Sequence, residues 1–179
     1  MTSKDIITFW FEEIESCKWW SKDYHFDNLI KKRFSDIHRA ANCCELSGWR
    51  KTPQGRLAEI IILDQFSRNM FRNSALSFAD DPLALALAQA AIAVGADAEL
   101  NQNQRSFLYM PFMHSESLII HDVAVKLYTD NGSQHSLDFE IRHRTIIAEF
   151  GRYPHRNSIL GRTSTQAELA FLTQDNSSF

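Results

Sequence analysis

The chain has 179 residues, of which 44% are hydrophobic and 23% are charged. This is enough chain for one domain with a large core, and 13 phenylalanines with four tryptophans exclude a mainly disordered protein. The formal net charge of −3 at pH 7 excludes the strongly basic surface of a typical nucleic-acid-binding domain.

Caps and breakers in the N-terminal half of the chain predict four helices. A capping side chain stands before a proline at Thr52-Pro53 and again at Asp81-Pro82, which is typical of helix starts. Closer to the N-terminus, apolar residues recur at spacings of three and four and form a helical stripe. The helices expected here cover about residues 2–15, 23–45, 52–71 and 81–95.

Four more helices are predicted in the C-terminal half. Pro111 kinks or ends the first of them, and Asn131-Gly132 forms a turn. Thr165 begins the last helix with a capping box that Glu168 completes. These helices cover about residues 102–113, 115–128, 137–150 and 165 onward.

The arrangement of these segments predicts the fold class. No segment alternates polar and apolar residues over the length of a strand, and helix pairs joined by short loops are typical of bundles and superhelices. We therefore predict an all-α protein of seven to nine helices in a single domain, residues 1–173. The domain is either a helical bundle or a TPR-like superhelix of helix pairs. The polar residues 174–179 are expected to form a frayed tail.

The N-terminus and the cysteines indicate the cellular compartment. Residues 1–13 contain no uninterrupted apolar stretch and are acidic by Glu12, unlike a signal peptide. The longest apolar run, residues 83–94, is too short to cross a bilayer. Three cysteines, two of them adjacent, do not form a disulfide framework. We therefore expect a cytoplasmic protein with reduced thiols and without a membrane or nucleic-acid partner.

Polar side chains interrupt the apolar surface of the third predicted helix. Asp64 and Arg68 fall one turn apart inside an apolar sector of the helix, with Asn69 beside them. A carboxylate and a guanidinium in such a place are expected to be buried and bonded to each other. The pair either locks helix packing, which is the usual role of such pairs, or orients Arg68 toward a pocket.

The loop from Gly151 to Thr165 concentrates positive charge just before a helix. Its basic side chains are Arg152, His155, Arg156 and Arg162. Free backbone N–H groups, the positive end of the helix dipole and guanidinium groups together favour an anionic ligand. The alternative is a structural loop pinned by bonds from arginine to carboxylates and carbonyls.

Asp64 and Glu116 are the carboxylates expected to neutralise this loop. The loop cations outnumber these two carboxylates, and Asp64 is already partly committed to Arg68. We therefore predict that at least one arginine keeps no carboxylate partner. That arginine, which Arg156→Ala would test, should face a groove beside His114 and attract an anion.

The motif His114-Ser115-Glu116 carries the most reactive residue types of the chain. His121 follows His114 two helical turns later, which does not match the one-turn spacing of helical zinc ligands. We therefore predict no bound metal and no cofactor. A catalytic triad is not indicated either, because neighbours in sequence rarely meet with the required geometry. His114 is expected to be a buried, hydrogen-bonded side chain.

These motifs together resemble a bacterial family known as domain of unknown function 924, over nearly the whole chain. Ser67 stands where this family usually has proline, and Tyr153 where it usually has phenylalanine. The resemblance implies a helical, tetratricopeptide-like fold and brings no accepted activity. The motifs that carry it are Phe9-Trp10-Phe11, Thr52-Pro53, Gly55-Arg56-Leu57, Leu63-Asp64-Gln65-Phe66, Arg68-Asn69, His114-Ser115-Glu116 and the loop from Gly151 to Thr165.

Three functions are compatible with the sequence. The leading hypothesis is a binding module whose polar pocket takes an anionic small molecule or the carboxylate of a peptide. A second is a hydrolase-type enzyme with His114 or His155 as general base and a carboxylate to orient it. A third is a purely structural or protein-interaction domain. The residues predicted to line the pocket are Asp64, Arg68, Asn69, His114, Glu116, Arg152, His155 and Arg156.

Overall fold

Helices form close to the positions that the capping signals predict. The computed structural model describes residues 1–175 and 177, which contain helices and turns and no strand. The all-α class is therefore confirmed. The helical segments are α1 (Ser3–Thr8), α2 (Tyr24–Asn42), α3 (Pro53–Ile61), α4 (Ser67–Met70), α5 (Asp81–Ala93), α6 (Gln102–Met113), α7 (Leu118–Asn131), α8 (Gln134–Phe150) and α9 (Gln166–Phe171).

Side-chain caps explain several of the helix starts. The Asp23 carboxylate accepts hydrogen bonds from two backbone N–H groups of α2, and Thr52 accepts one from Gly55 at the start of α3. Thr165 and Glu168 form the predicted capping box of α9. Each cap satisfies backbone donors that have no partner inside the helix.

The start of α7 differs from the predicted one, whereas the bounds of α6 agree with the prediction. α7 begins at Leu118 and not at residue 115, because the chain is still extended at Ser117. His114 therefore ends α6 and does not share a helix with His121. Pro111 does not end its helix, since α6 continues to Met113. A proline one turn from the C-terminus of a helix removes only one backbone hydrogen bond.

The third predicted helix is a continuous helical run that contains a π turn. α3 passes into the π turn Ile62–Phe66 (η4) and continues as α4. Every residue of the π turn is buried, and the run packs against α1, α2, α5 and α6. A π turn widens the helix locally and is frequent at functional sites. It places Asp64 at the centre of the molecule.

The largest hydrophobic cluster surrounds this central run. The rings of Phe9 and Phe34 lie 4.7 Å apart, and the Phe34 ring lies 4.8 Å from that of Phe66. Trp10 is completely buried beside them. The cluster extends from Ile6 to Tyr128 along the sequence, so it includes side chains from α1 to α7. Burial of these large aromatic side chains is the main source of stability in this part of the chain.

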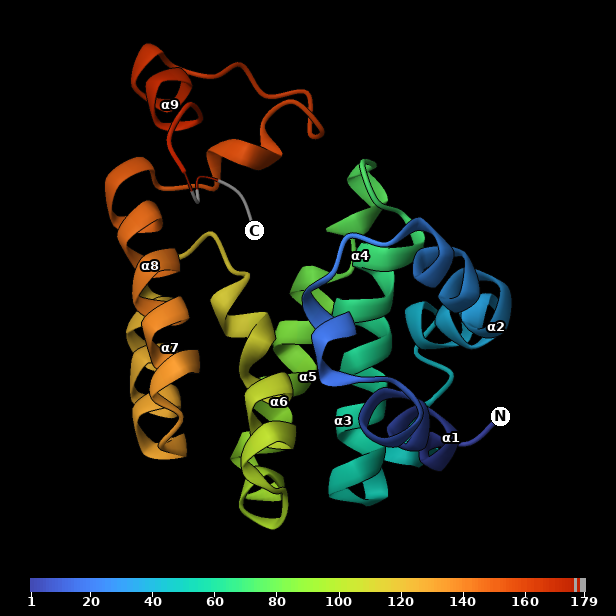
Figure 1. The fold of residues 1–179 in the computed structure, drawn as a ribbon. Coiled ribbons are helices and arrows are strands. Elements are labelled where there is room, and N and C mark those ends of the chain that lie inside the picture. The colour runs from blue at the N-terminus through green and yellow to red at the C-terminus, as the bar shows by residue number, and fades with distance from the viewer. Residues whose placement is uncertain (176, 178–179) are drawn as a thin grey trace.

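The C-terminal segments lie at one side of this core. Figure 1 shows α7 and α8 side by side, with α9 and the preceding loop above the end of α8. A second, smaller cluster consists of Ile146, Ile147 and Tyr153, with Phe150 and Phe171 packed against it. The loop at residues 151–165 then returns toward the start of α5, where Arg156 bonds to Asp81.

The stretch Ala75–Ala93 is apolar and long enough, by length and composition alone, to cross a membrane. In the fold it is not one helix, because a 3-10 turn (Ala75–Ser77, η5) and further turn residues precede α5. Its carboxylates Asp80 and Asp81 bond to side chains of α2 and α4. Ala84 and Ala88 of α5 pack into the main cluster. The stretch is thus part of the helical core.

The expected frayed tail is described only in part. Residues 176, 178 and 179 lie outside the described residues. The hydroxyl of Ser177 donates a hydrogen bond to the carbonyl oxygen of Leu172 at 3.2 Å.

Candidate functional site

A buried carboxylate holds a histidine at the end of α6. Asp64 in the π turn is 1% exposed, and its Oδ1 lies 2.7 Å from Nδ1 of His114. The amide of Gln65 donates to Oδ2 of the same carboxylate at 2.6 Å. Burial alone would raise the pKa of Asp64, but the charge of Arg68 and the bonds from His114 and Gln65 hold this pKa well below its usual range. The carboxylate is therefore ionised, and it accepts a hydrogen bond from the protonated Nδ1 of His114.

His114 consequently offers its other ring nitrogen to a ligand. Burial and the nearby charge of Arg68 lower the pKa of His114, although Asp64 acts in the opposite direction. The imidazole is thus neutral at pH 7, with its proton on Nδ1. Nε2 carries a lone pair and has no hydrogen-bond partner among the described residues. This is the arrangement of a proton acceptor oriented by a carboxylate.

Two arginines share a second carboxylate beside this pair. Arg68 donates two hydrogen bonds to the Asp81 carboxylate, at 2.8 and 3.0 Å, and one to the backbone carbonyl oxygen of Asp64 at 2.8 Å. It also forms an ion pair with the Asp64 carboxylate at 3.1 Å. Arg156 bonds to Asp81 at 3.1 Å and to the carbonyl oxygen of His114 at 3.1 Å. Two guanidinium groups and two carboxylates therefore cancel in charge around a neutral imidazole.

Arg156 is packed between two aromatic rings. Its guanidinium carbon lies 4.4 Å from the centre of the Phe78 ring and 4.7 Å from that of Tyr153. Its Nε is buried and has no hydrogen-bond partner among the described residues. Burial, together with the charge of Arg68, lowers its pKa. Arg156 is thus fixed by stacking and by shared bonds, not by a carboxylate of its own.

His114 and Arg156 both line a groove of about 390 Å³. Its walls come from the start of α5, the end of α6 and the returning loop. Apolar side chains form most of the lining, and the remainder is polar or charged. The lining residues are Ala75, Phe78, Ala79, Asp81, Pro82, Leu85, Pro111, His114, Ser115, Glu116, Arg156 and Leu160. A concave, mostly apolar site with a few converging polar groups is typical of small-molecule binding.

Glu116 ties the loop to the end of α6. Its carboxylate accepts two hydrogen bonds from Arg162, at 2.6 and 2.9 Å, and one from the backbone N–H of Tyr153 at 2.8 Å. Burial raises the pKa of Glu116, but these hydrogen bonds outweigh it and lower the pKa. Glu116 lines the groove as an ionised and fully bonded side chain, so its role here is to position the wall.

Comparison with known proteins places the chain in a family. The sequence profile of a family described as bacterial protein of unknown function (DUF924) matches residues 6–176. The chain belongs to the DUF924 family. A solved structure, that of the protein of unknown function ATU0120 from Agrobacterium tumefaciens, is 40% identical, with a TM-score of 0.91 and 96% of each chain covered. Comparison with curated proteins gives no match.

Two predicted site residues lie away from the groove of this DUF924 protein. Asn69 donates to Asp27 at 2.8 Å, in a cluster with Arg72 between α2 and the end of α4. His155 is partly buried, its ring centre is 5.5 Å from that of Tyr153, and burial lowers its pKa to about 4. Neither residue lines the groove, although His155 directly precedes Arg156, which does.

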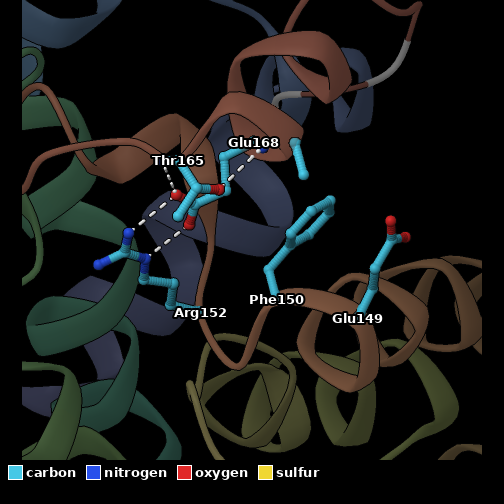
Figure 2. Close-up of a pocket in the computed structure, with 6 residues that line it drawn as sticks. Glu149, Phe150, Arg152, Thr165 and Glu168 are labelled. Carbon is cyan, nitrogen blue, oxygen red and sulfur yellow. Dashed lines mark hydrogen bonds and ion pairs between the residues drawn. The ribbon is translucent and has the colours of Figure 1, made fainter.

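Arg152 lies at a different pocket, of about 460 Å³, between the end of α8 and α9. It bonds to Glu168 at 2.6 and 2.8 Å and to the carbonyl oxygen of Thr163 at 3.0 Å. Figure 2 shows Arg152 pointing to the Glu168 carboxylate, with Thr165 on the same side and with Phe150 and Glu149, the last residues of α8, to the right. The pair fastens α9 to the loop, and the structure does not bring Arg152 together with His114.

The prediction of an arginine without a carboxylate partner is wrong. Each of the three loop arginines bonds to a carboxylate, namely Arg152 to Glu168, Arg156 to Asp81 and Arg162 to Glu116. Sequence reasoning counted only carboxylates that already belonged to noticed motifs. It treated Asp81 as a helix cap and Glu168 as part of a capping box. Glu168 does accept from the backbone N–H of Thr165 and from Arg152 at once. The predicted cap at Asp81 is wrong, because the N-cap position of α5 is Asp80, without a side-chain cap bond, and the Asp81 carboxylate binds Arg68 and Arg156. Asp81 was therefore missed as a partner of the loop, and Phe78 was missed because no motif of the sequence marks it.

His38, Ser67 and Asp80 form a cluster that has the composition of a catalytic triad. His38 Nε2 lies 2.7 Å from Ser67 Oγ, but Asp80 approaches the same nitrogen at 3.5 Å and not the opposite one. The Ser67 hydroxyl is fully buried and donates to the carbonyl oxygen of Leu63 at 2.6 Å. A carboxylate on the opposite ring nitrogen and an accessible hydroxyl are what a nucleophile requires. The cluster is structural.

A metal centre has no ligands at the groove. Within residues 1–175 and 177 there is no group of three or more His, Cys, Asp or Glu side chains that could hold a metal ion. His114 and His121 are directed to different carboxylates, Asp64 and Glu140. That no metal binds stays a prediction, which elemental analysis of the purified protein would test.

Proposed function

We propose that the groove binds a small amphipathic molecule with an acidic head group, such as a carboxylic acid or a phosphate monoester. The observation that carries this proposal is the Asp64–His114 pair, which leaves Nε2 as a proton acceptor on a residue that lines the groove. The apolar part of the ligand would lie against Phe78, Leu85 and Leu160. Hydrophobic contact gives affinity in such sites, and the polar groups fix orientation.

Binding of an acid at this groove is coupled to the uptake of one proton by His114. The arginines of the groove are neutralised by Asp64 and Asp81, so a bare anion gains little from them. If the ligand brings its proton to Nε2, His114 becomes an imidazolium that donates a hydrogen bond to the bound anion. The affinity should therefore rise as the pH falls from 8 to 6.

The test is a thermal-shift titration with benzoate, hexanoate, phosphate and acetate against sodium chloride at equal ionic strength. We expect a saturable rise in melting temperature, which is larger for benzoate or hexanoate than for acetate and larger at pH 6 than at pH 8. His114→Gln should remove the rise. The control His25→Gln changes an exposed histidine on α2 and should keep it. A response no larger than that of chloride, or an equal response in His114→Gln, would contradict the proposal.

The same pair supports a second candidate, a hydrolase in which His114 is the general base. A histidine whose Nδ1 is held by a buried carboxylate can take a proton from water as the water attacks a bound ester. Hydrolysis of aryl esters by the wild type, with a rate that follows deprotonation of His114 and is lost in His114→Gln, would favour this candidate over binding alone. A purely structural role would leave His114→Gln without effect in either experiment.

Two broader features of the protein also belong to the proposal. The packing of α6 on α7 and of α7 on α8 supports a TPR-like arrangement of helix pairs. The three cysteines are exposed and unpaired, which supports a reducing, cytoplasmic location. A membrane or nucleic-acid partner is not part of the proposal.

A further inference from the structure

A second histidine–carboxylate pair lies sealed inside the molecule behind the groove. Nδ1 of His121 on α7 is 2.7 Å from Oε1 of Glu140 on α8, and both side chains are 0% exposed. Unlike Asp64, Glu140 has no arginine bonded to it, and its Oε2 is buried without a hydrogen-bond partner among the described residues. A bare carboxylate would be poorly stabilised in this position. Burial accordingly raises the pKa of Glu140, against the effect of the bond from His121.

The outer nitrogen of His121 must carry a proton. Nε2 lies 2.9 Å from the carbonyl oxygen of Ser115, which can only accept a hydrogen bond. It also lies 3.2 Å from the hydroxyl oxygen of Tyr153, whose own proton goes to the carbonyl oxygen of Met113 at 2.5 Å. Both contacts therefore require His121 Nε2 to be a donor.

One further proton must then lie between Nδ1 and Oε1. Either Glu140 is protonated and donates to Nδ1, or His121 is an imidazolium that donates to Glu140. Removal of this proton would set two lone pairs against each other at 2.7 Å. The pair therefore holds one proton as long as its geometry is kept.

The titratable side chains around the His121–Glu140 pair do not supply a substitute for its shared proton. The titratable or charged side chains near it are Tyr128 on α7, His143 and Arg144 on α8, Tyr153 in the loop and His114 beyond Ser115. Burial raises the pKa of both tyrosines and lowers that of His143 to about 3. Arg144 is paired with Asp122 at 2.8 Å. Tyr128, Tyr153 and His143 therefore keep one protonation state between pH 6 and 9.

The pair acts on the segment that carries His114. Its hydrogen bonds end on the carbonyl oxygens of Ser115 and, through Tyr153, of Met113, which are the two neighbours of His114 in the chain. We propose that the His121–Glu140 pair is a proton-operated latch that holds residues 113–116 at the groove and releases them when its proton is lost at alkaline pH. This inference rests on the proposed function of the groove, whose regulation it describes.

The proton held by the latch makes the stability of the folded state depend on pH in a defined direction. An unfolded histidine loses its proton at about pH 6.5, whereas the folded pair keeps one proton above that pH. The folded state then binds more protons than the unfolded state, so the stabilisation is complete below about pH 6.5 and decreases as the pH rises. The equilibrium constant for folding should decrease by up to about tenfold per pH unit until the folded pair itself is deprotonated.

The experiment measures unfolding by urea between pH 5 and 9 without any ligand, for the wild type, Glu140→Gln and Glu149→Gln. The amide that Glu140→Gln introduces can donate to Nδ1 of His121 at every pH, so this variant should lose the decrease between pH 6.5 and 9. Glu149 is an exposed glutamate on the same helix, and its removal should keep the decrease. A flat wild-type profile, or an unchanged decrease in Glu140→Gln, would overturn the latch.

Two further measurements keep the test decisive if Glu140→Gln does not fold. Nitrogen NMR of the wild-type histidine rings should show His121 Nε2 protonated at every pH and a proton change at the pair above pH 6.5. Hydrogen exchange of the amides in residues 113–117, corrected for its intrinsic pH dependence, should lose protection by about tenfold per pH unit over the same range. A constant ring signal and constant protection would contradict the latch. Because none of these readouts uses a ligand, failure of the groove to bind benzoate would leave them unchanged.

Discussion

Two regions of this protein are held together by different forces. The region around α1 to α6 is an aromatic core in which Phe9, Phe34 and Phe66 pack ring against ring. The returning loop at residues 151–165 is instead attached by three arginine–carboxylate pairs and contributes few side chains to either apolar cluster. The groove lies where the two regions meet, so one of its walls is fixed by apolar packing and the other mainly by charge.

The largest effect on stability is expected in the aromatic core. Phe34→Ala removes a fully buried ring that contacts Phe9 and Phe66 and leaves a cavity that this tightly packed region cannot fill. We expect a loss of about 4 kcal/mol in the free energy of unfolding, measured with urea. Leu169→Ala, at an exposed position on α9, is the control and should change the free energy of unfolding by less than about 0.5 kcal/mol.

An intermediate effect is expected where the regions meet. Asp64→Ala leaves Arg68 and His114 without a shared partner in a buried site, although Arg68 keeps Asp81. We expect a loss of about 3 kcal/mol, near the lower end of the range for broken buried ion pairs. Asp64→Asn keeps the shape and an acceptor oxygen and should lose less. Equal losses in both variants would contradict this expectation, because they would assign the whole loss to the missing charge and none to the shape and acceptor oxygen that asparagine keeps.

The smallest effect is expected in the loop. Glu116→Gln weakens the bond to Arg162, whose side chain is about a quarter exposed, so the loss should be roughly 1 kcal/mol. This loss should shrink when the salt concentration is raised from about 0.05 to about 0.5 M, because salt screens partly exposed pairs. The loss in Phe34→Ala should not depend on salt in this way. A salt-independent loss in Glu116→Gln would remove the distinction between the two regions.

The sequence predicted local features well and partnerships across the fold poorly. Thr52-Pro53 and Thr165 identify helix starts because a cap acts within one turn of the chain. The burial of Asp64 and its bond to Arg68 followed from helical periodicity. The bond from Asp64 to His114 joins residues far apart in sequence, and nothing in the periodicity indicates it. The π turn was not predicted either, since its residues also suit an α-helix.

The bond between Arg156 and Asp81 has a consequence for the order in which the site is assembled. The residues that build the aromatic core are synthesised before Arg156 and Leu160, and N-terminal parts of a chain can begin to fold during synthesis. The groove can then close only after a nascent core already exists. A chain in which the loop detaches would keep its core and lose one wall of the groove, so occupancy of the groove would report on completion of the fold.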